Sequence, residues 1–401
     1  MVVPGRWHAF DLARELEQMG SLHRLITNYP KSQTRRWDIP DRKVVSLPIS
    51  GVLGRVAARI GGDAFAMRQQ FRINNLFARE AARHLGSPDL VHAWSGAAEP
   101  ALLAAKARGI STVLERSSSH MIEQCRLLRE EYASIGLRWV ETPAATVERE
   151  LREYELADRV FVPSFFVERT FVERGFSGNR LVRNGFGVDL ARFTPGRGED
   201  GVFRVLHAGA LSVRKGIHHL VRAFQQADVA RSELLLVGGA LAETRHLVDS
   251  SDSRIRCTGH VPQAELPACY RSASVFVLAS IEEGQAMVQA QALACGVPLI
   301  CTASTGGEDF LELGGKGKEV APGLKEYPAG YVVRPREPGL LAVAIRKLAE
   351  SPERLESMRA AAAGLAHRDL SWKNYAAKNA RHYETILRSS ENFSGLAFST
   401  R

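Results

Sequence analysis

The sequence predicts an α/β fold made of two doubly wound, Rossmann-like domains, on three observations. Short apolar segments rich in β-branched residues alternate with helical patterns along the whole chain, which is typical of parallel sheets covered by helices on both faces. The length of 401 residues exceeds one ordinary domain and suits two of about 150–200 residues. The segment TPGRGEDG (194–201) combines glycine, proline and charge, so it predicts a linker between the domains.

The first half of the chain opens with a helical pattern. Residues 8–19 place apolar side chains at helical spacing, and Gly20 ends the pattern. The strands predicted in this half are 22–27, 43–47, 89–93, 111–115, 159–163 and 181–184.

The second half repeats the alternation. Its predicted strands are 203–208, 233–237, 254–259, 274–280 and 298–302. Residues 372–387 predict a long final helix, and we expect residues 389–401 to form a loose tail.

The composition excludes several classes of protein. No apolar run approaches the roughly 18 residues that span a bilayer, and the N-terminal stretch MVVPGRWHAF lacks the apolar region of a secretory signal. The five cysteines have no metal-binding spacing, and scattered free cysteines are typical of a reducing compartment. The net charge of +9 favours an anionic partner, but no nucleic-acid-binding motif is present. We therefore expect a cytoplasmic protein that does not bind nucleic acid.

The stretch HAGALSVRKGIHHLVRAF (207–224) follows a predicted strand and opens a helix. Gly209 allows the backbone to turn and a ligand to approach closely. Arg214 and Lys215 stand at the start of the helix, where two cations and free backbone N–H groups favour an anion, most naturally a diphosphate. A solvated basic cap is the alternative, but cations at a helix N-terminus oppose the helix dipole, which favours the phosphate site.

The stretch IEEGQAMVQAQALACGVP (281–298) follows strand 274–280 in the same way. Glu282, Glu283 and Gly284 form the turn, and the helix begins near Ala286. Carboxylates at this turn accept hydrogen bonds from sugar hydroxyls, and Gln291 reaches the same crevice from the helix. The alternative is that the carboxylates only stabilise the helix dipole.

Two further stretches also follow predicted strands directly, but their motifs are less specific. STGGEDF (304–310) follows strand 298–302 and offers backbone N–H groups to an anion. ERSSSH (115–120) places His120 after a strand of the first domain, although a lone histidine is more often structural. Because open α/β sheets bind ligands beyond the carboxyl ends of their strands, each of these stretches lies where a ligand is expected.

Together these stretches resemble a known pattern. The order G-x-x-S-x-R-K-G, G-H-V (259–261), L-A-S-I-E-E-G…A-x-A-C-G-V-P and T-G-G-E-D resembles the C-terminal domain of glycosyltransferase family 4, the group 1 glycosyltransferases. In the first half, Gly5 before helix 8–19 resembles the family's glycine loop. FVPSFFVERTFVERG (161–175) and NGFGVDLARFTP (184–195) resemble its domain-closing segments.

The resemblance covers residues 5–388 and implies the GT-B fold, in which the two domains face a central cleft. It implies an acceptor-binding domain (1–195), a nucleotide-sugar-binding domain (196–370) and a C-terminal helix (371–388) that crosses back to the first domain.

The resemblance also implies roles for single residues. Arg214 and Lys215 would bind the diphosphate of the donor, and Glu283 would contact its sugar. His120 would contact the sugar or the leaving phosphate. The other donor-binding residues that the resemblance implies are Gly5, Gly209, Gly259, His260, Val261, Gly284, Gln285, Ala286, Met287, Val288 and Gln291. Among these, Gly259–Val261 would frame the base and Gln291 would meet the ribose, whereas Gln289 is expected to face a helix neighbour.

Three features depart from the family pattern. Gln291 stands where the family has the second glutamate of its E-x7-E motif, and an amide lacks the charge-assisted strength of a carboxylate. Ala210 stands where the family has an arginine. Only four residues precede Gly5, so the first strand is either very short or begins upstream.

The implied reaction is transfer of a hexosyl group with retention of configuration, by front-face attack and without a covalent intermediate. No cofactor is expected besides the nucleoside-diphosphate sugar as co-substrate. No D-x-D element indicates a metal ion, since DSSDS (249–253) has the wrong spacing and follows no strand. Arg214, Lys215 and helix N-termini would therefore stabilise the leaving phosphate. The implied acceptor is a glycan or a lipid-linked sugar, as in cell-envelope or exopolysaccharide biosynthesis.

Residues 53–84 combine arginines with an apolar stripe. The stripe is Leu53, Val56, Ala57 and Ile60, and the arginines are Arg55, Arg59, Arg68, Arg72, Arg79 and Arg83. A basic amphipathic helix can lie on an anionic membrane, here the inner membrane face. A solvated face over an ordinary core stripe is the alternative.

Other functions remain open at this point. A non-catalytic nucleotide-sugar-binding protein of the same fold would account for Gln291, Ala210 and the short N-terminus. A nicotinamide-dependent oxidoreductase is disfavoured because no G-x-G-x-x-G opens a helix after a strand. A sugar-nucleotide epimerase shares the architecture but fits the 281–298 stretch less well.

Overall fold

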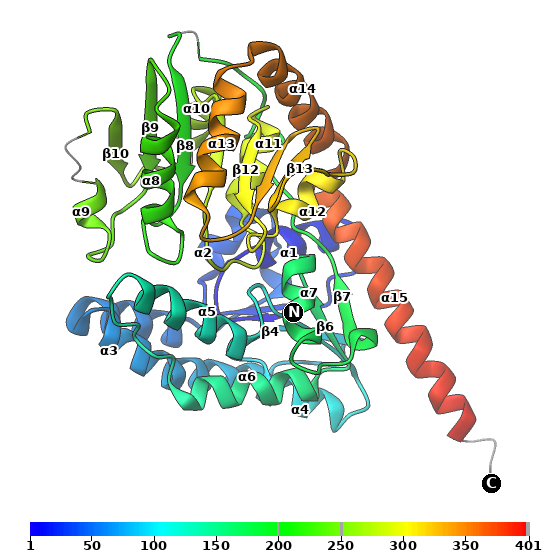
Figure 1. The fold of residues 1–401 in the computed structure, drawn as a ribbon. Helices are drawn as coiled ribbons and strands as arrows, with labels where there is room; N and C mark the ends of the chain where they lie inside the picture. Colours follow the sequence, from blue (N-terminus) through cyan, green and yellow to red (C-terminus); the bar gives the residue numbers. More distant parts are fainter. Residues whose placement is uncertain (199, 249–251, 398–401) are drawn as a thin grey trace.

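The computed structural model describes residues 1–198, 200–248 and 252–397, without the side chains of 58–68, 248 and 390–397. These residues form two α/β domains stacked on one another, and a long helix runs from the second domain along the first (Figure 1). The two doubly wound domains that the alternating pattern predicts are thereby confirmed. None of the described helices combines the length and the apolar character needed to cross a bilayer.

The described part of the first domain contains a seven-stranded sheet in the order β3-β2-β1-β4-β5-β6-β7, with every pair parallel. Its strands are β1 (Val2–Val3), β2 (Leu25–Thr27), β3 (Val44–Ser46), β4 (Leu90–Trp94), β5 (Ser111–Glu115), β6 (Arg159–Val162) and β7 (Leu181–Arg183). β1 has two residues in the described chain. It is nevertheless central, because Val2 pairs with both Ile26 of β2 and Ala93 of β4.

Seven helices of the described chain accompany this sheet. They are α1 (Ala9–Gln18), α2 (Lys31–Thr34), α3 (Pro48–Arg83), α4 (Glu99–Lys106), α5 (Met121–Ser134), α6 (Ala144–Leu156) and α7 (Phe165–Val172). α1 follows the predicted periodicity, since its apolar face, including Phe10, Leu12 and Leu16, is buried.

The second domain has an eight-stranded sheet among the described residues, in the order β10-β9-β8-β11-β12-β15-β14-β13. Its strands are β8 (Phe203–Ala208), β9 (Ser232–Val237), β10 (Ile255–Gly259), β11 (Val275–Leu278), β12 (Leu299–Thr302), β13 (Lys318–Ala321), β14 (Leu324–Tyr327) and β15 (Gly330–Val333). β14 pairs antiparallel with both β13 and β15, and the other neighbouring strands pair parallel. Sequence analysis missed the last three strands, because β13 is a largely exposed edge strand without an apolar pattern and β14 is partly polar.

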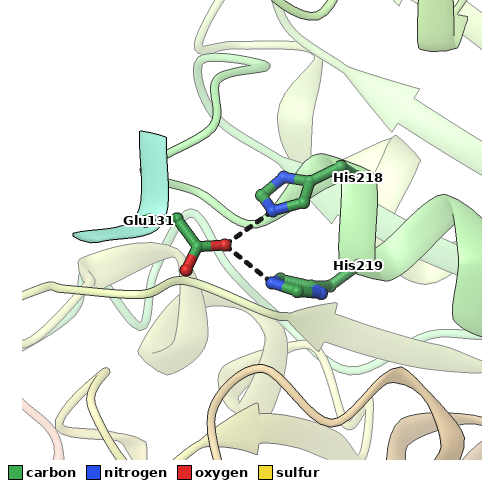
Figure 2. Close-up of side chains that lie close together, drawn as sticks. All are labelled: Glu131, His218 and His219. Carbon is green, nitrogen blue, oxygen red and sulfur yellow. Dashed lines mark hydrogen bonds and ion pairs between the residues drawn. The ribbon is translucent and has the colours of Figure 1, made fainter. Parts of the chain in front are cut away.

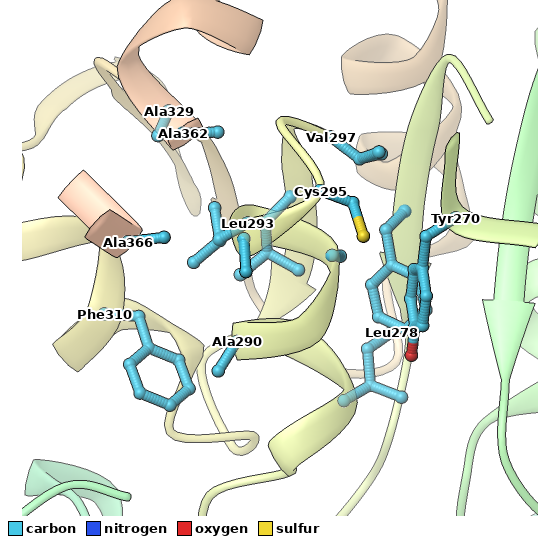
Figure 3. Close-up of a cluster of buried hydrophobic side chains, with 14 of the residues drawn as sticks. Tyr270, Leu278, Ala290, Leu293, Cys295, Val297, Phe310, Ala329, Ala362 and Ala366 are labelled. Atoms are coloured by element: carbon cyan, nitrogen blue, oxygen red, sulfur yellow. The ribbon is translucent and has the colours of Figure 1, made fainter. Parts of the chain in front are cut away.

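The helices of this domain are α8 (Ile217–Ala227), α9 (Arg245–Val248), α10 (Leu266–Arg271), α11 (Met287–Ala294), α12 (Gly307–Glu312), α13 (Pro338–Ala349) and α14 (Pro352–Asp369). The core lies around α11, where Ala290 shares one buried cluster with Tyr270 and Phe310 (Figure 3). Ala362 and Ala366 of α14 join this cluster. Small side chains on both helices let α11 and α14 approach closely, which explains the small-residue composition of 281–298.

The chain crosses between the domains twice at one place. Val188 lies on the first crossing and its N–H donates to the carbonyl of Leu370 on the second, at 2.7 Å. From there α15 (Trp372–Ala397) runs back along the first domain, as the resemblance implies (Figure 1). The predicted loose tail is wrong up to Ala397, because no proline interrupts the backbone hydrogen bonds after residue 388. Residues 398–401 lie outside the described chain, as do 249–251 of the DSSDS segment.

Candidate active site

The stretches singled out in the second domain meet where β8 and β11 lie side by side. Residues 209–216 follow β8 and residues 279–286 follow β11, and the N–H of Ile281 donates to the carbonyl of Arg214 at 2.9 Å. The close approach depends on Gly216, whose φ is +67° and whose added Cβ would lie 2.0 Å from the carbonyl oxygen of Ala279. The strand order changes direction between β8 and β11, which is where such sheets bind ligands.

Lys215 and Glu283 are brought together as the sequence predicts. The Nζ of Lys215 lies 2.6 Å from a carboxylate oxygen of Glu283, and both side chains keep a small exposed surface. The residue predicted to bind a diphosphate and the residue predicted to bind a sugar therefore lie in direct contact, with Glu283 buried and Lys215 partly exposed.

Arg214 pairs with the neighbouring carboxylate, Glu282. Its Nη2 lies 2.9 Å from Glu282 Oε2, and its Nε donates to the same oxygen at 3.0 Å. The other oxygen of Glu282 accepts from the N–H and the hydroxyl of Ser119 at 2.9 and 2.8 Å, and Gln124 also donates to this carboxylate. Although burial acts to raise it, Arg214 and Ser119 hold the pKa of Glu282 below its usual value. Glu282 is thus an ionised, buried link between the domains, whereas the sequence predicts for it only the role that it shares with Glu283, accepting hydrogen bonds from sugar hydroxyls.

Arg116 is a second residue that sequence analysis missed. It is buried, pairs with Glu150 at 2.7 Å, and donates to the carbonyl of Ser119 and the side chain of Gln124. It therefore shapes the loop that reaches Glu282. An arginine directly after an apolar strand, in ERSSSH, is the sequence signal that indicates such a role.

His120 lies in the first domain under aromatic rings. Its ring packs against Tyr154 and Phe171 at centroid distances of 5.1 and 4.9 Å, and its backbone N–H donates to the hydroxyl of Thr170. Burial, with Arg116 and other positive charge nearby, lowers the pKa of His120 to about 4, so the imidazole is neutral at physiological pH. In the described part of the chain its hydrogen bonds and ring contacts stay within its own domain. Its contact with the donor stays a prediction.

The side chains of Gln285 and Gln289 are engaged in the protein. The Oε1 of Gln285 accepts from the N–H of Phe186 at 2.6 Å, and its amide nitrogen donates to the carbonyl of Gly306. Gln289 is fully buried and exchanges hydrogen bonds with Thr305, so it faces a neighbouring loop. The side chain of Gln285 is therefore occupied by contacts within the protein, and its predicted contact with the sugar donor is left to its backbone.

Gln291 and Met287 line an interdomain cavity of about 380 Å³. Its other walls include Trp7 and Trp372, and Tyr270 donates to Gln291 Oε1 at 2.9 Å. Gly259, His260 and Val261 follow β10 at the edge of the sheet and do not line this cavity in the described structure. Of the residues predicted to bind the sugar donor, only Met287 and Gln291 line this cavity.

The glycine loop after β1 approaches the same cavity. The carbonyl of Gly5 accepts from the Thr27 hydroxyl at 3.2 Å, and an added Cβ on Gly5 would lie 2.4 Å from the indole nitrogen of Trp7. Trp7 has a positive φ of 43° and is 64% exposed. A large apolar side chain held in this backbone conformation points to a functional role, which sequence analysis did not assign.

Gly284 is the point at which the loops of the two domains touch. Its added Cβ would lie 1.7 Å from the carbonyl oxygen of Ser117, and the hydroxyl of Ser164 donates to the Gly284 carbonyl at 2.6 Å. Only a residue without a side chain fits there. The predicted glycine is therefore required by the closed arrangement of the domains.

Residues 6–192 match the family described as Glycosyltransferase Family 4, and residues 202–351 match the family described as Glycosyl transferases group 1. The chain is 27% identical over 318 residues to D-inositol 3-phosphate glycosyltransferase 1 of Catenulispora acidiphila, which covers 73% of this chain and 71% of the relative. It is 27% identical over 323 residues to the GDP-mannose-dependent monoacylated alpha-(1-6)-phosphatidylinositol monomannoside mannosyltransferase of Corynebacterium glutamicum, covering 74% and 76%.

Solved structures resemble the whole chain. The sucrose-phosphate synthase from Thermosynechococcus elongatus superimposes with a TM-score of 0.68 at 19% identity, covering 97% of this chain and 96% of that one. Anabaena Alr3699/HepE in complex with UDP gives a TM-score of 0.67 at 16% identity, covering 96% and 98%. Likeness at this level of identity shows the fold alone.

Proposed function

The chain belongs to the group 1 glycosyltransferases of family 4 and has the GT-B fold, and on that premise we propose that it transfers a hexosyl group from a nucleoside-diphosphate sugar to a glycan or lipid-linked acceptor, with retention and without a metal ion. The observation that carries the proposal is the pairing of Arg214 and Lys215 with Glu282 and Glu283 at the switch point of the sheet. The names of the mannosyltransferase relative and of the UDP-bound neighbour support a nucleotide-sugar donor.

The two cations have different roles in this proposal. Cleavage of the bond between the anomeric carbon and the diphosphate builds negative charge on the leaving phosphate. Arg214 is held by the buried Glu282, so it is pre-positioned to stabilise that charge. Lys215 is paired with Glu283, and a donor diphosphate offers it a more highly charged partner. The exchange frees Glu283 to accept hydrogen bonds from the hydroxyls of the donor sugar.

The environment of Glu282 supports a step without a covalent intermediate. Glu282 accepts from Ser119, Gln124 and Arg214 and is fully buried, so it is not free to attack an anomeric carbon. In the proposed step the acceptor hydroxyl attacks from the face that the diphosphate leaves. Its proton goes to an oxygen of the departing phosphate.

The nucleoside is proposed to occupy the cavity beside Gln291. Tyr270 holds Gln291 Oε1, and we propose that the contact with the ribose comes from the amide nitrogen, a hydrogen-bond donor. The family's glutamate at this position is an acceptor. The protein would therefore meet the ribose oxygens rather than the ribose hydroxyl protons.

The proposal is tested by calorimetric titration with UDP, GDP and ADP, followed by transfer assays with the matching sugars. Lys215→Ala is expected to lower turnover by about 10²–10³-fold, the usual loss for one charge-stabilising donor. Lys373→Ala, at an exposed lysine of α15, is the matched control and should behave as wild type. Near-normal turnover of Lys215→Ala would remove this residue from the mechanism. Nucleotide binding without turnover of any activated sugar would favour the non-catalytic alternative.

We also propose that α3 rests on an anionic membrane surface. Ile49, Val52, Leu53 and Val56 recur at helical spacing and are between 44% and 68% exposed, so a purely core role is wrong for Leu53 and Val56. Ala57 is buried, as a core stripe would have it. Of the arginines in this region, Arg55, Arg72, Arg79 and Arg83 are exposed. Ile60, Arg59 and Arg68 belong to the side chains that the structure does not describe.

Co-sedimentation with anionic and with neutral vesicles tests the membrane proposal. The wild-type chain should bind anionic vesicles, and Leu53→Glu with Val56→Glu should weaken this binding by at least tenfold because two exposed apolar side chains that would enter the membrane surface are replaced by charge. Leu241→Glu, at an exposed leucine of the second domain, should bind as wild type. Equal binding of all three proteins, or none, contradicts the proposal.

A further inference from the structure

One side-chain cluster outside the donor site joins the two domains. Glu131 on α5 of the first domain faces His218 and His219 at the start of α8 in the second (Figure 2). The Nε2 atoms of both histidines lie against a single carboxylate oxygen, Glu131 Oε1, at 2.7 and 2.8 Å. The next residue of α5 makes a second interdomain bond, from the Tyr132 hydroxyl to Glu243 at 2.7 Å.

The cluster has the composition of a transition-metal site. Two imidazole nitrogens and one carboxylate oxygen, each able to supply one ligand atom, lie within 4.8 Å of one another. Zinc accepts such a set of two histidines and a glutamate, and imidazole also suits cobalt and nickel. Both imidazoles keep an exposed surface, 12% and 16% of their side chains, through which solvent can complete the coordination.

The carboxylate is oriented for this role. Glu131 is fully buried, and Arg336 donates through its Nε to the other oxygen, Oε2, leaving Oε1 directed at the histidines. Ligating carboxylates are commonly held by such an outer partner. The positive charge of Arg336 also opposes a cation nearby, so the expected affinity is moderate, with a dissociation constant in the micromolar range.

We propose that Glu131, His218 and His219 bind a divalent ion of the zinc class that bridges the two domains. One ligand comes from α5 and two from the helix that follows Arg214 and Lys215, so a bound ion ties the phosphate-binding segment to the first domain. The ion favours the closed arrangement and slows its opening. This inference does not depend on the proposed transfer reaction, whose residues it leaves untouched.

The test is titration of the full chain, free of any polyhistidine tag, with Zn²⁺ and with Co²⁺. Cys257 is an exposed thiol and would bind zinc by itself, so the measurements use a Cys257→Ser background. We expect one ion per chain, a thermal midpoint raised by zinc, and at least tenfold weaker binding in His219→Gln. His367→Gln, at an exposed histidine of α14, should bind as the background protein does.

Absence of zinc binding, or equal binding in His219→Gln, overturns the proposal and leaves the cluster as an ion-paired clasp. If His219→Gln lowers the thermal midpoint without metal, its weaker binding could reflect lost stability. The cobalt absorption spectrum of the Cys257→Ser protein with both histidines intact then tests the proposal. Ligand-field bands of a site with histidine nitrogen ligands support the proposal. A spectrum of hydrated cobalt overturns it.

Discussion

At the scale of single residues, the neighbouring carboxylates Glu282 and Glu283 receive different tasks from their surroundings. Glu282 is fully buried and receives hydrogen bonds from both domains, whereas Glu283 keeps a small exposed surface and pairs with Lys215 at 2.6 Å and with Arg214 at 3.9 Å. A buried carboxylate with several donors is ionised and fixed in place. Glu282 is therefore a positioning residue for Arg214, and Glu283 is the one left to meet a substrate.

Replacing the buried carboxylate tests this division. Glu282→Gln keeps the size but leaves Arg214 without its counter-ion, and removal of one partner from a buried pair typically costs about 3–5 kcal/mol. We expect a thermal midpoint lowered by several degrees together with weaker nucleotide binding. Glu308→Gln, which affects a partly exposed pair with Lys325, is the control and should cost at most about 1 kcal/mol. Equal midpoints for the two variants would contradict the assignment.

The raised pKa of Asp309 predicts that the stability of the protein depends on pH. It accepts from the N–H of Phe165 across the domain interface, and burial raises its pKa from 3.8 to about 7 despite that bond and Arg183. Between about pH 4 and 7, Asp309 is protonated in the folded state and ionised in the unfolded state. The free energy of unfolding therefore falls as the pH rises through that window.

The variant Asp309→Asn removes that loss. Its thermal midpoint should match the wild type near pH 4 and exceed it at pH 8, with a gain on the order of 2–4 kcal/mol from the shift of about three pKa units. Thermal unfolding of both proteins at pH 4 and pH 8 measures the difference. A difference that does not change with pH would show that Asp309 does not bind this proton.

At the scale of elements, the turn between β11 and α11 does more than reverse the chain. It carries both carboxylates and presses Gly284 against the loop that follows β5. The same turn is anchored by Gln285 and by the buried Gln289 to the loop after β12. We expect a rigid turn of this kind to present backbone N–H groups to the proposed donor diphosphate without loss of order on binding.

Gly284→Ala tests that fit. Because its Cβ would lie 1.7 Å from the Ser117 carbonyl, the domains cannot close as they do here. We expect at least a tenfold loss in kcat/KM and a small change in thermal midpoint, since closure rather than either core is disturbed. Gly239→Ala is the matched control, because nothing lies within 4 Å of its added Cβ. Full activity of Gly284→Ala would mean that the closed arrangement is not the catalytic one.

At the scale of the whole molecule, the two crossings between the domains form a compact hinge. Residue 188 forms a bridge with Ser371, and an added Cβ on Gly187 would lie 2.8 Å from the backbone of Trp372. Contacts far from this hinge, from Glu282 to the cluster at Glu131, hold the domains together. Opening must therefore break several interdomain bonds while the hinge stays packed, which suits a substrate-gated motion.

Gly187→Ala disturbs the hinge alone. We expect kcat and KM to change together and the nucleotide-dependent decrease in radius of gyration, measured by small-angle X-ray scattering, to shrink or vanish. Gly178→Ala has nothing within 4 Å of its added Cβ and should behave as wild type. A variant that closes normally on nucleotide would place the hinge elsewhere.

Much of the fold and part of the site follow from local sequence. The buried strands, helix α1 and the glycine turns could be predicted because periodicity and backbone freedom act over a few residues. The meeting of Lys215 and Glu283 could be predicted because both follow adjacent parallel strands. The edge strand β13, its neighbour β14 and the extent of α15 carry no such signal, so local patterns do not predict them.

The sequence by itself determined which segments could carry chemistry, and only the tertiary structure decided which side chain in each segment faces the site. Ser119 and Glu282 are 163 residues apart, and their hydrogen bond holds Glu282 in the domain interface, whereas Glu283 pairs with Lys215. The same holds for Gln289, bound to Thr305, and for His120, enclosed by rings. The physical reason is that burial and hydrogen-bond partners come from distant segments, whereas local patterns report only what neighbouring residues permit.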